Sequence, residues 1–312
     1  MRSGFVSIIG RPNAGKSTLL NALVGEKLAI VTRKPQTTRN RITGILNVKR
    51  KGSQPAAQIV FVDTPGIHKP LDQLNKRMMQ EVYDSLEGCD LLLTMVDATQ
   101  KFGSGDEFVV ELLKTRQKRS FLILNKIDLL DKQKLLPVIE HWSNLYKFEE
   151  IIPISAQTGA GLDDLTRAVS KALPEGPNYF PPDQVTDQPE RFVVAEYIRE
   201  QILLMTGQEV PYATTVIVET YEELEKLTRI SAVIYVEREG QKAIVIGKQG
   251  AMLKKIGSGA RNQIERLIGT KVYLELLVKV RAGWRESRQF VDELDWRKQL
   301  ETLAARRGRP EK

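Results

Sequence analysis

The sequence predicts an α/β domain with a mostly parallel sheet and helices on both faces, followed by a smaller α+β domain. Three observations support this fold class. Short apolar runs alternate with helical patterns over residues 1–172, prolines then cluster, and the order of helices and strands changes after them. Strands that alternate with helices of ordinary length are typical of parallel sheets covered on both faces.

The first domain, residues 1–172, is predicted element by element from its apolar pattern. Buried strands are expected at 5–9, 58–62, 90–96, 120–124 and 150–154. Helices are expected at 16–24, 71–87, 106–117, 132–146 and 161–173. The run 41–48 meets the second of these strands across a short polar turn, so the pair predicts a hairpin that adds one antiparallel strand.

Five of the 14 prolines lie between residues 173 and 190. Proline fixes φ and removes a backbone donor, so this segment predicts a semi-rigid linker rather than a helix or a central strand. A long loop within a single domain is the alternative, and such loops are uncommon at this length.

The second domain, residues 191–290, shows a different order of elements. A helix at 190–207 precedes strand runs at 213–221 and 229–239, and a further helix then leads into a strand at 271–281. This α-β-β-α-β order predicts a sheet covered by helices on one side. Residues 291–312 are expected to form a C-terminal helix and tail.

Composition narrows the class of protein. Hydrophobic residues make up 41% and charged residues 28% of the chain, which is typical of a soluble globular protein. No apolar run approaches the ~18 residues that span a bilayer, and the start of the sequence leaves no room for a signal peptide. The single cysteine, Cys89, excludes an internal disulfide and a cysteine cluster for zinc. We therefore expect a cytoplasmic protein.

The positive charge is concentrated in one window of the chain. Residues 241–290 contain eleven Lys and Arg against three Asp and Glu, a surplus equal to the net +8 of the whole chain. Basic residues spread along the chain would indicate only a solvated surface. Their concentration in one window indicates a polyanionic partner.

A phosphate-binding motif, GRPNAGKS, follows the first predicted strand and opens the first predicted helix. Backbone N–H groups of such a loop approach the phosphates, and the helix N-terminus adds positive potential. Lys16 is expected to reach the β- and γ-phosphates, and Ser17 to bind Mg²⁺. The whole predicted phosphate site comprises Gly10, Arg11, Pro12, Asn13, Ala14, Gly15, Lys16, Ser17 and Thr18.

Three further motifs follow at the ends of later strands. DTPG supplies Asp63, Thr64, Pro65 and Gly66, NKID supplies Asn125, Lys126 and Asp128, and ISAQTG supplies Ser155 and Ala156. A carboxylate at Asp128 can accept hydrogen bonds from guanine N1–H and the 2-amino group. Adenine offers neither donor, and an unpaired buried carboxylate costs ~1–3 kcal/mol or more, so the base is predicted to be guanine.

Together these motifs resemble the translation-factor-like class of GTPases. The resemblance implies that Asn125 braces the loops, that the Lys126 stem packs on guanine and that the Ala156 N–H meets the guanine carbonyl. Asp63 would bind Mg²⁺ through water, and the Gly66 N–H would sense the γ-phosphate.

The segment PQTTRNR, residues 35–41, predicts a switch loop in which a threonine completes the Mg²⁺ shell. Its T-T-R pattern resembles a GTPase branch that includes the Era and tRNA-modifying families. We expect Thr38 to be the ligand, with Thr37 as the alternative. The predicted metal ligands are therefore Ser17, Thr38 and Asp63.

The residue after Gly66 raises the question of what positions the attacking water. Ile67 has no polar side-chain atom, and we expect His68 to be a solvent-facing loop residue. Backbone groups of the switch loops are therefore expected to hold the water. Asn13 resembles the asparagine of potassium-activated members of this branch, which implies that a K⁺ ion binds near Asn13. The predicted catalytic residues are therefore Lys16, Thr38, Gly66 and Asn13.

In the second domain, GKQG precedes an amphipathic helix with apolar residues at 253, 256, 260, 264 and 267. This setting resembles a type II KH domain, whose glycine loop clamps a single-stranded nucleic-acid backbone. The resemblance implies contacts from Ile246, Gly247, Lys248, Gln249, Gly250 and Lys254. A glycine turn that opens a basic, solvated helix is the alternative.

The order of the two domains resembles the Era family over nearly the whole chain. The resemblance implies a monomeric bacterial GTPase that uses GTP, GDP and Mg²⁺. It also implies that the protein binds the 3′ end of small-subunit ribosomal RNA rather than DNA, assists small ribosomal subunit assembly, and contacts the inner membrane peripherally. Three rivals remain: a GTP-dependent tRNA-modifying enzyme, a module for anionic membrane surfaces, and an ATPase motor, against which Asp128 argues.

Overall fold

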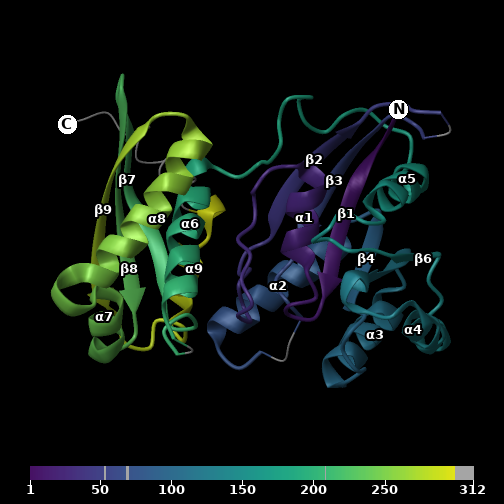
Figure 1. Cartoon of the computed structure of the whole chain (residues 1–312), viewed down its shortest axis with the longest axis horizontal. Helices are drawn as coiled ribbons and strands as arrows, with labels where there is room; N and C mark the ends of the chain where they lie inside the picture. Colours follow the sequence, from purple (N-terminus) through teal and green to yellow (C-terminus); the bar gives the residue numbers. More distant parts are fainter. Residues whose placement is uncertain (53, 68–69, 208, 299–312) are drawn as a thin grey trace. The chain divides into compact units, whose positions relative to one another are not determined.

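The computed structural model describes residues 1–52, 54–67, 70–207 and 209–298 of the chain (Figure 1). Contacts divide it into two compact units. The first comprises Met1–Pro70 and Met78–Asp187, and the second comprises Leu71–Arg77 and the chain from Gln188 onward. This division differs from the predicted boundaries because 71–77 groups with the second unit and most of the predicted linker groups with the first.

The first unit is built on a six-stranded sheet in the order β2-β3-β1-β4-β5-β6. Its strands are β1 (Arg2–Gly10), β2 (Ile42–Val48), β3 (Ala57–Asp63), β4 (Leu91–Asp97), β5 (Ser120–Asn125) and β6 (Glu150–Pro153). Only the β2–β3 pair is antiparallel, and the other pairs are parallel. The mostly parallel sheet and the added hairpin strand are therefore as predicted.

Helices cover both faces of this sheet (Figure 1). They are α1 (Lys16–Val24), α2 (Gln73–Glu87, in this unit from Met78 onward), α3 (Ser104–Arg116), α4 (Lys132–Leu145) and α5 (Leu162–Ala172). One apolar cluster packs α1 and α5 against one face, and two others pack α2, α3 and α4 against the opposite face. Strands buried on both faces need apolar residues throughout, which is why they read as short continuous runs.

The parallel strands of the first unit end at the same edge of the sheet. β1 ends at Gly10, β3 at Asp63, β4 at Asp97 and β5 at Asn125. Ligands of open α/β sheets bind outside the carboxyl ends of the strands. The motifs GRPNAGKS, DTPG and NKID therefore converge because parallel pairing brings these strand ends together.

The proline-rich segment is bound to the first unit rather than free. Residues 174–187, which we call the strap, run along the start of β1 and the outer edge of β2. The Ile45 N–H donates to Val185 O at 2.9 Å, and the Thr186 hydroxyl donates to Thr43 O at 2.7 Å. An uncovered edge strand is a template for aggregation, so the strap satisfies donors and acceptors that β2 would otherwise expose.

Gln58 is the main side-chain anchor of the strap. It is completely buried on β3, and its Oε1 accepts the N–H groups of Tyr179 and Phe180 at 2.7 and 2.9 Å. Its Nε2 donates to Phe180 O and to Asn47 Oδ1, both at 2.9 Å. The Gln58 amide therefore accepts two hydrogen bonds and donates two, and all four join it to the sheet edge or to the strap.

The second unit contains a three-stranded sheet in the order β7-β8-β9. Its elements are α6 (Glu190–Met205), β7 (Thr215–Glu223), β8 (Leu227–Val236), α7 (Glu239–Ile246), α8 (Ala251–Ile268), β9 (Lys271–Val280) and α9 (Arg288–Glu293). β7 and β8 are antiparallel, whereas β8 and β9 are parallel. The sequence prediction missed α7 because its short apolar run, AIVI, has no helical period of its own.

Trp284 and Phe290, which follow the last strand, belong to the core of the second unit. Trp284 is fully buried and donates to Ala213 O at 2.9 Å, with the Phe290 ring 6.0 Å away. α9 begins at Arg288, three residues before the predicted start of the C-terminal helix. Among the described residues, no helix has the length and apolar character needed to cross a membrane.

Replacement of Gln58 tests the anchoring of the strap. Gln58→Leu keeps the side chain's size but leaves the paired groups of Tyr179, Phe180 and Asn47 without a partner. We expect a loss of about 2–4 kcal/mol in the free energy of unfolding, because unpaired buried polar groups cost ~1–3 kcal/mol each. Protease cleavage within the strap should accelerate in the same variant.

Gln184→Leu is the matched control, because the Gln184 side chain donates to Thr186 O within the strap itself. It should leave both measurements close to those of the unaltered protein. Cleavage of Gln58→Leu at the unaltered rate would contradict the anchoring role.

Candidate nucleotide site and nucleic-acid interface

The phosphate loop joins the end of β1 to the start of α1, which begins at Lys16. Gly15 adopts φ 103°, a left-handed conformation that favours glycine. A Cβ at this position would lie 2.2 Å from Nδ2 of Asn125. The glycine therefore lets the loop turn into the helix and lets the base-binding loop approach it closely.

Lys16 is held inside this loop. Its Nζ donates to Gly10 O at 3.1 Å and to Arg11 O at 3.0 Å, and the residue is 6% exposed. Burial lowers the pKa of Lys16 to about 8, against the opposing effect of the Asp63 charge. The ammonium group lies at the N-terminus of α1, where an anion is favoured by the helix dipole.

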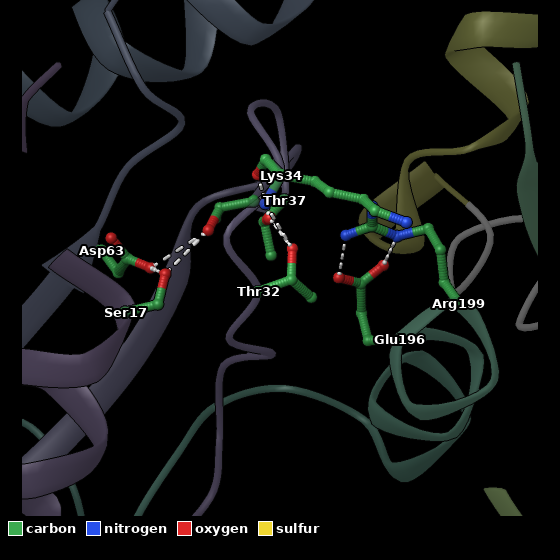
Figure 2. A network of polar contacts seen from close by, with 8 residues as sticks. Ser17, Thr32, Lys34, Thr37, Asp63, Glu196 and Arg199 are labelled. Carbon is green, nitrogen blue, oxygen red and sulfur yellow. Dashed lines mark hydrogen bonds and ion pairs between the residues drawn. The ribbon is translucent and has the colours of Figure 1, made fainter. Parts of the chain in front are cut away.

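Three side-chain oxygens meet beside the loop. Ser17 Oγ donates to Asp63 Oδ2 at 2.6 Å (Figure 2). The same Ser17 Oγ lies 2.8 Å from Thr38 Oγ1. Thr38 Oγ1 lies 3.4 Å from Asp63 Oδ2. Oxygen ligands of this kind suit Mg²⁺, which prefers one or two protein oxygens together with substrate phosphates and water.

The fit of a cation is supported by Asp63 itself. The residue is fully buried, and its Oδ1 has no hydrogen-bond partner among the described residues. Burial raises the pKa of Asp63 to about 6, although the Lys16 charge and hydrogen bonds from Ser17 and Thr38 lower it. A buried carboxylate with a free oxygen would be stabilised in its charged form by a nearby divalent ion.

The switch-loop geometry distinguishes between the two threonines. Thr38 is buried beside Ser17 and Asp63. The Thr37 hydroxyl instead lies 2.7 Å from the Thr32 hydroxyl and donates to Lys34 O at 2.6 Å (Figure 2). This arrangement favours Thr38 over Thr37 as the candidate metal ligand.

Asn125 ties the base-binding loops to the phosphate loop. Its Nδ2 donates to Ala14 O at 2.8 Å, and its Oδ1 accepts the Ala156 N–H at 2.9 Å. The bracing expected of Asn125 is thus present, but the Ala156 N–H expected to meet guanine is engaged by Asn125 instead. A guanine carbonyl would have to share that donor.

The neighbouring base-site residues differ in their exposure. Asp128 is exposed, although selection of guanine requires a buried carboxylate, so its burial would have to come from the bound base. Lys126 is oriented by an ion pair from its Nζ to Asp97 Oδ2 at 2.5 Å. Asp97 was not among the predicted site residues, although its place at the end of β4 was a signal for one. Ser155 Oγ accepts the Thr158 N–H at 3.1 Å.

The DTPG loop packs directly on the phosphate loop. The Ile67 N–H donates to Gly10 O at 3.1 Å, and a Cβ on Gly66 would lie 2.8 Å from Pro12 Cα. The Ile67 side chain is 1% exposed and belongs to the core cluster that packs α2 and α3 on the sheet. Ile67 thus serves the core and cannot orient a water molecule, while His68 lies outside the described residues.

Two more residues of the predicted nucleotide site have structural partners. The Thr64 hydroxyl donates to Ile8 O at 2.8 Å in a fully buried setting, so this side chain serves the fold. Asn13 is exposed, and its Nδ2 donates to Arg33 O at 3.0 Å, two residues before the switch loop. The structure brings the phosphate-loop, DTPG, NKID and ISAQTG residues together at one edge of the sheet, as predicted.

The GKQG motif of the second unit lies between α7 and α8. Gly247 and Gly250 have positive φ values of 72° and 78°, and Gln249 has φ 51°. Lys248 and Lys254 are exposed, and Ile246 is half-buried at the end of α7. The loop therefore presents backbone and cationic groups to solvent at the N-terminus of an 18-residue helix.

Ile244 is an exposed apolar residue on α7. Its exposure was not predicted, because α7 itself was not predicted. Its side chain is 50% exposed three residues before the glycine loop. On α8, Ile256, Ala260 and Ile264 are fully buried as predicted, whereas Leu267 is 39% exposed. The predicted apolar face of α8 is therefore buried at its centre and becomes exposed at Leu267, near the C-terminus of the helix.

Gly66→Ala tests the contact between the DTPG and phosphate loops. The new Cβ would collide with backbone atoms of Pro12, which cannot yield as a flexible side chain would. We expect the rate of GTP hydrolysis to fall about 100-fold, because a displacement of ~1 Å can cost that factor. GDP affinity should change far less, because GDP lacks the γ-phosphate that this loop is expected to sense.

Single-turnover hydrolysis and GDP titration measure the two effects. Gly88→Ala is the control, because its Cβ would meet only Asp84 O at an ordinary 3.7 Å. An unchanged hydrolysis rate in Gly66→Ala would refute the role of this contact.

Family models match both units. Residues 5–126 match the 50S ribosome-binding GTPase model, and residues 209–285 match the KH domain model. Among curated relatives, GTPase Era of Geobacter metallireducens is 53% identical over 95% of this chain and 98% of its own length. GTPase Era of Syntrophus aciditrophicus is 50% identical and is covered to 95%.

Solved structures show the same relationship. An Era variant from Aquifex aeolicus bound to GDP and AlF₄⁻ superimposes with a TM-score of 0.89 at 40% identity, over 94% of this chain and 98% of that one. A structure of Era with MgGDPNP and nucleotides 1506–1542 of 16S ribosomal RNA gives a TM-score of 0.90 at the same identity and coverage. The fold, the phosphate and base loops and this similarity over nearly the full length lead to one conclusion: the chain belongs to the Era family of GTPases, with a GTPase domain followed by a KH domain.

Proposed function

We propose that this protein is a GTP-hydrolysing switch that binds the 3′ end of small-subunit ribosomal RNA through its KH domain and assists assembly of the small ribosomal subunit. The observation that carries the GTPase part is the convergence of Lys16, the Ser17–Thr38–Asp63 oxygens and the Asn125 brace at one edge of the sheet. The RNA part is supported by the KH fold and by the RNA-bound Era structure.

The nucleotide is held by groups that the fold has already placed. Lys16 and the N-terminus of α1 favour the phosphates, and the Asn125 brace holds the base loop against the phosphate loop. Asp128 pairs with the two guanine donors and excludes adenine. Bound Mg²⁺, held by Ser17, Thr38 and Asp63, neutralises charge on the phosphates.

Hydrolysis depends on a water held by the backbone of the switch loops. Ile67 is committed to the core, so the groups near the γ-phosphate are the Gly66 N–H, the Thr38 segment and Lys16. Such a site lacks a side chain that orients the water, so we expect slow intrinsic hydrolysis. The γ-phosphate orders both switch segments, and its loss releases them.

The RNA is bound by the GKQG loop and the start of α8. Bare glycines allow close approach of a phosphate backbone, and Lys248 and Lys254 supply charge without an ion pair among the described residues. The surplus of cationic residues in 241–290 favours a polyanion over an acidic peptide of low charge.

The switch is tested by comparing RNA affinity in the two nucleotide states. Single-stranded RNA with the sequence of the small-subunit 3′ end should bind the GTP-analogue form and the GDP form with different affinities. By linkage, the RNA must change GTP affinity by the same factor. Lys248→Ala should weaken RNA binding and reduce its salt dependence while GTP affinity stays unchanged.

Equal RNA affinity in both states would overturn the coupling. Unchanged RNA binding in Lys248→Ala together with Lys254→Ala would overturn the assignment of the RNA site. Fluorescence anisotropy at two salt concentrations provides both measurements.

The potassium proposal is tested separately. We propose that K⁺ near Asn13 neutralises charge on the phosphates during hydrolysis, because Asn13 is exposed and its side chain contacts Arg33 O just before the switch loop. Hydrolysis should then be faster in KCl than in NaCl at equal ionic strength, and Asn13→Ala should remove the difference. Equal turnover of the unaltered protein in the two salts would show that K⁺ has no part.

A further inference from the structure

The phosphate loop is attached to α3 by a side chain that the phosphate-binding motif does not require. Arg11 Nη1 lies 2.7 Å from Asp106 Oδ2, in an ion pair whose carboxylate is 7% exposed and whose guanidinium is 39% exposed. The same Asp106 oxygen accepts the Gly103 N–H at 3.0 Å. One carboxylate thus binds the start of α3 and the phosphate loop together.

Gly105 provides the space for this arrangement. A Cβ on Gly105 would lie 2.9 Å from Nε, 3.1 Å from Cδ and 3.2 Å from Cγ of Arg11. The arginine side chain therefore lies flat along the backbone at Gly105, and any larger residue would displace it. The run GSGD at 103–106 thus accommodates the arginine at its third position and pairs with it at its fourth.

The backbone of Arg11 contacts the groups that handle the phosphates. Arg11 O accepts Lys16 Nζ at 3.0 Å and the Ala14 N–H at 3.4 Å. The next residue, Pro12, is the surface against which Gly66 packs. A shift of Arg11 would therefore move the lysine's anchor and the seat of the DTPG loop in one step.

We infer that Arg11 and Asp106 act as a pair of positioning residues for GTP hydrolysis, with Gly105 as the cradle that fixes the arginine. The pair acts through Lys16 and Pro12 and has no contact of its own with the reacting atoms. Its effect falls on the γ-phosphate step, because Lys16 and Gly66 are the groups expected to meet that phosphate. Binding of GDP relies more on the loop backbone and the base site.

An alternative is that the pair only stabilises the N-terminus of α3, since an acidic residue in the first helical turn is favourable in itself. The structural role and the positioning role predict different effects on the melting temperature and on kcat. A purely structural pair would lower the melting temperature and leave turnover of the folded enzyme alone. A positioning pair lowers kcat at a temperature where every variant is folded.

The test measures kcat, KM and the melting temperature of the full-length protein. Arg11→Ala should lower kcat about tenfold, a tenth of the loss expected for a displacement of ~1 Å at the reacting groups. KM for GTP should stay within about threefold, because the base site lies away from the substituted side chain and is unaltered. Gly105→Ala should lower kcat in the same direction without altering any charge.

A double-mutant cycle separates the pair from its two members. Asp106→Asn keeps an acceptor for the Gly103 N–H but removes the charge that attracts Arg11. If the two residues act together, Arg11→Ala with Asp106→Asn should lower kcat no further than Arg11→Ala alone. Arg11→Lys should restore part of the activity, because it keeps the charge but loses the planar guanidinium.

Arg119→Ala is the matched control. Arg119 forms a close ion pair with Glu149 at 2.8 Å, at the start of β5 and away from the phosphate loop, so its loss should leave kcat unchanged. Unchanged kcat in Arg11→Ala and Gly105→Ala would overturn the inference, whatever their melting temperatures. Strictly additive losses in the double mutant would also overturn it.

Discussion

The buried carboxylate of Asp63 is the constraint on which the arrangement of the nucleotide site depends. It ends β3 in a fully buried position, where an isolated charge would be costly. The structure compensates it with the Lys16 ammonium and with hydroxyl groups from Ser17 and Thr38. Because these partners come from the phosphate loop and the switch loop, compensating one charge brings three separate chain segments together.

Close backbone approach is the second requirement of the site. Gly15 leaves room for the Asn125 amide, and Gly66 leaves room for Pro12. These contacts allow the base loop, the phosphate loop and the DTPG loop to form one continuous body. Ile67 adds a hydrophobic attachment by inserting into the core beneath α2 and α3. A side chain committed in this way fixes the loop firmly, and catalysis must then rely on backbone groups and on charge.

The proline-rich strap shows how a connecting segment can also complete a fold. Its prolines prevent it from becoming a strand, yet it supplies the acceptor for Ile45 and occupies the edge that β2 would otherwise expose. Gln58 holds the strap in place because its one buried amide accepts two hydrogen bonds and donates two. The chain that leads into the KH domain is therefore fastened to the hairpin that follows the switch loop.

The sequence by itself determined the architecture and the chemistry of the nucleotide site. Apolar runs and helical periods located the six strands and five α-helices described in the first unit to within a few residues, because a parallel sheet needs continuous apolar strands. The motifs GRPNAGKS, DTPG and NKID predicted most of the candidate phosphate, metal and base residues, because each motif follows a strand end. Tertiary structure decided what local pattern does not encode. It favoured Thr38 over Thr37, buried Ile67, engaged the Ala156 N–H with Asn125 and joined Arg11 to Asp106. It also formed α7 from a run without helical period and fastened the strap to β2. Each of these outcomes depends on contacts between residues distant in the chain, and neither propensity nor spacing carries that information.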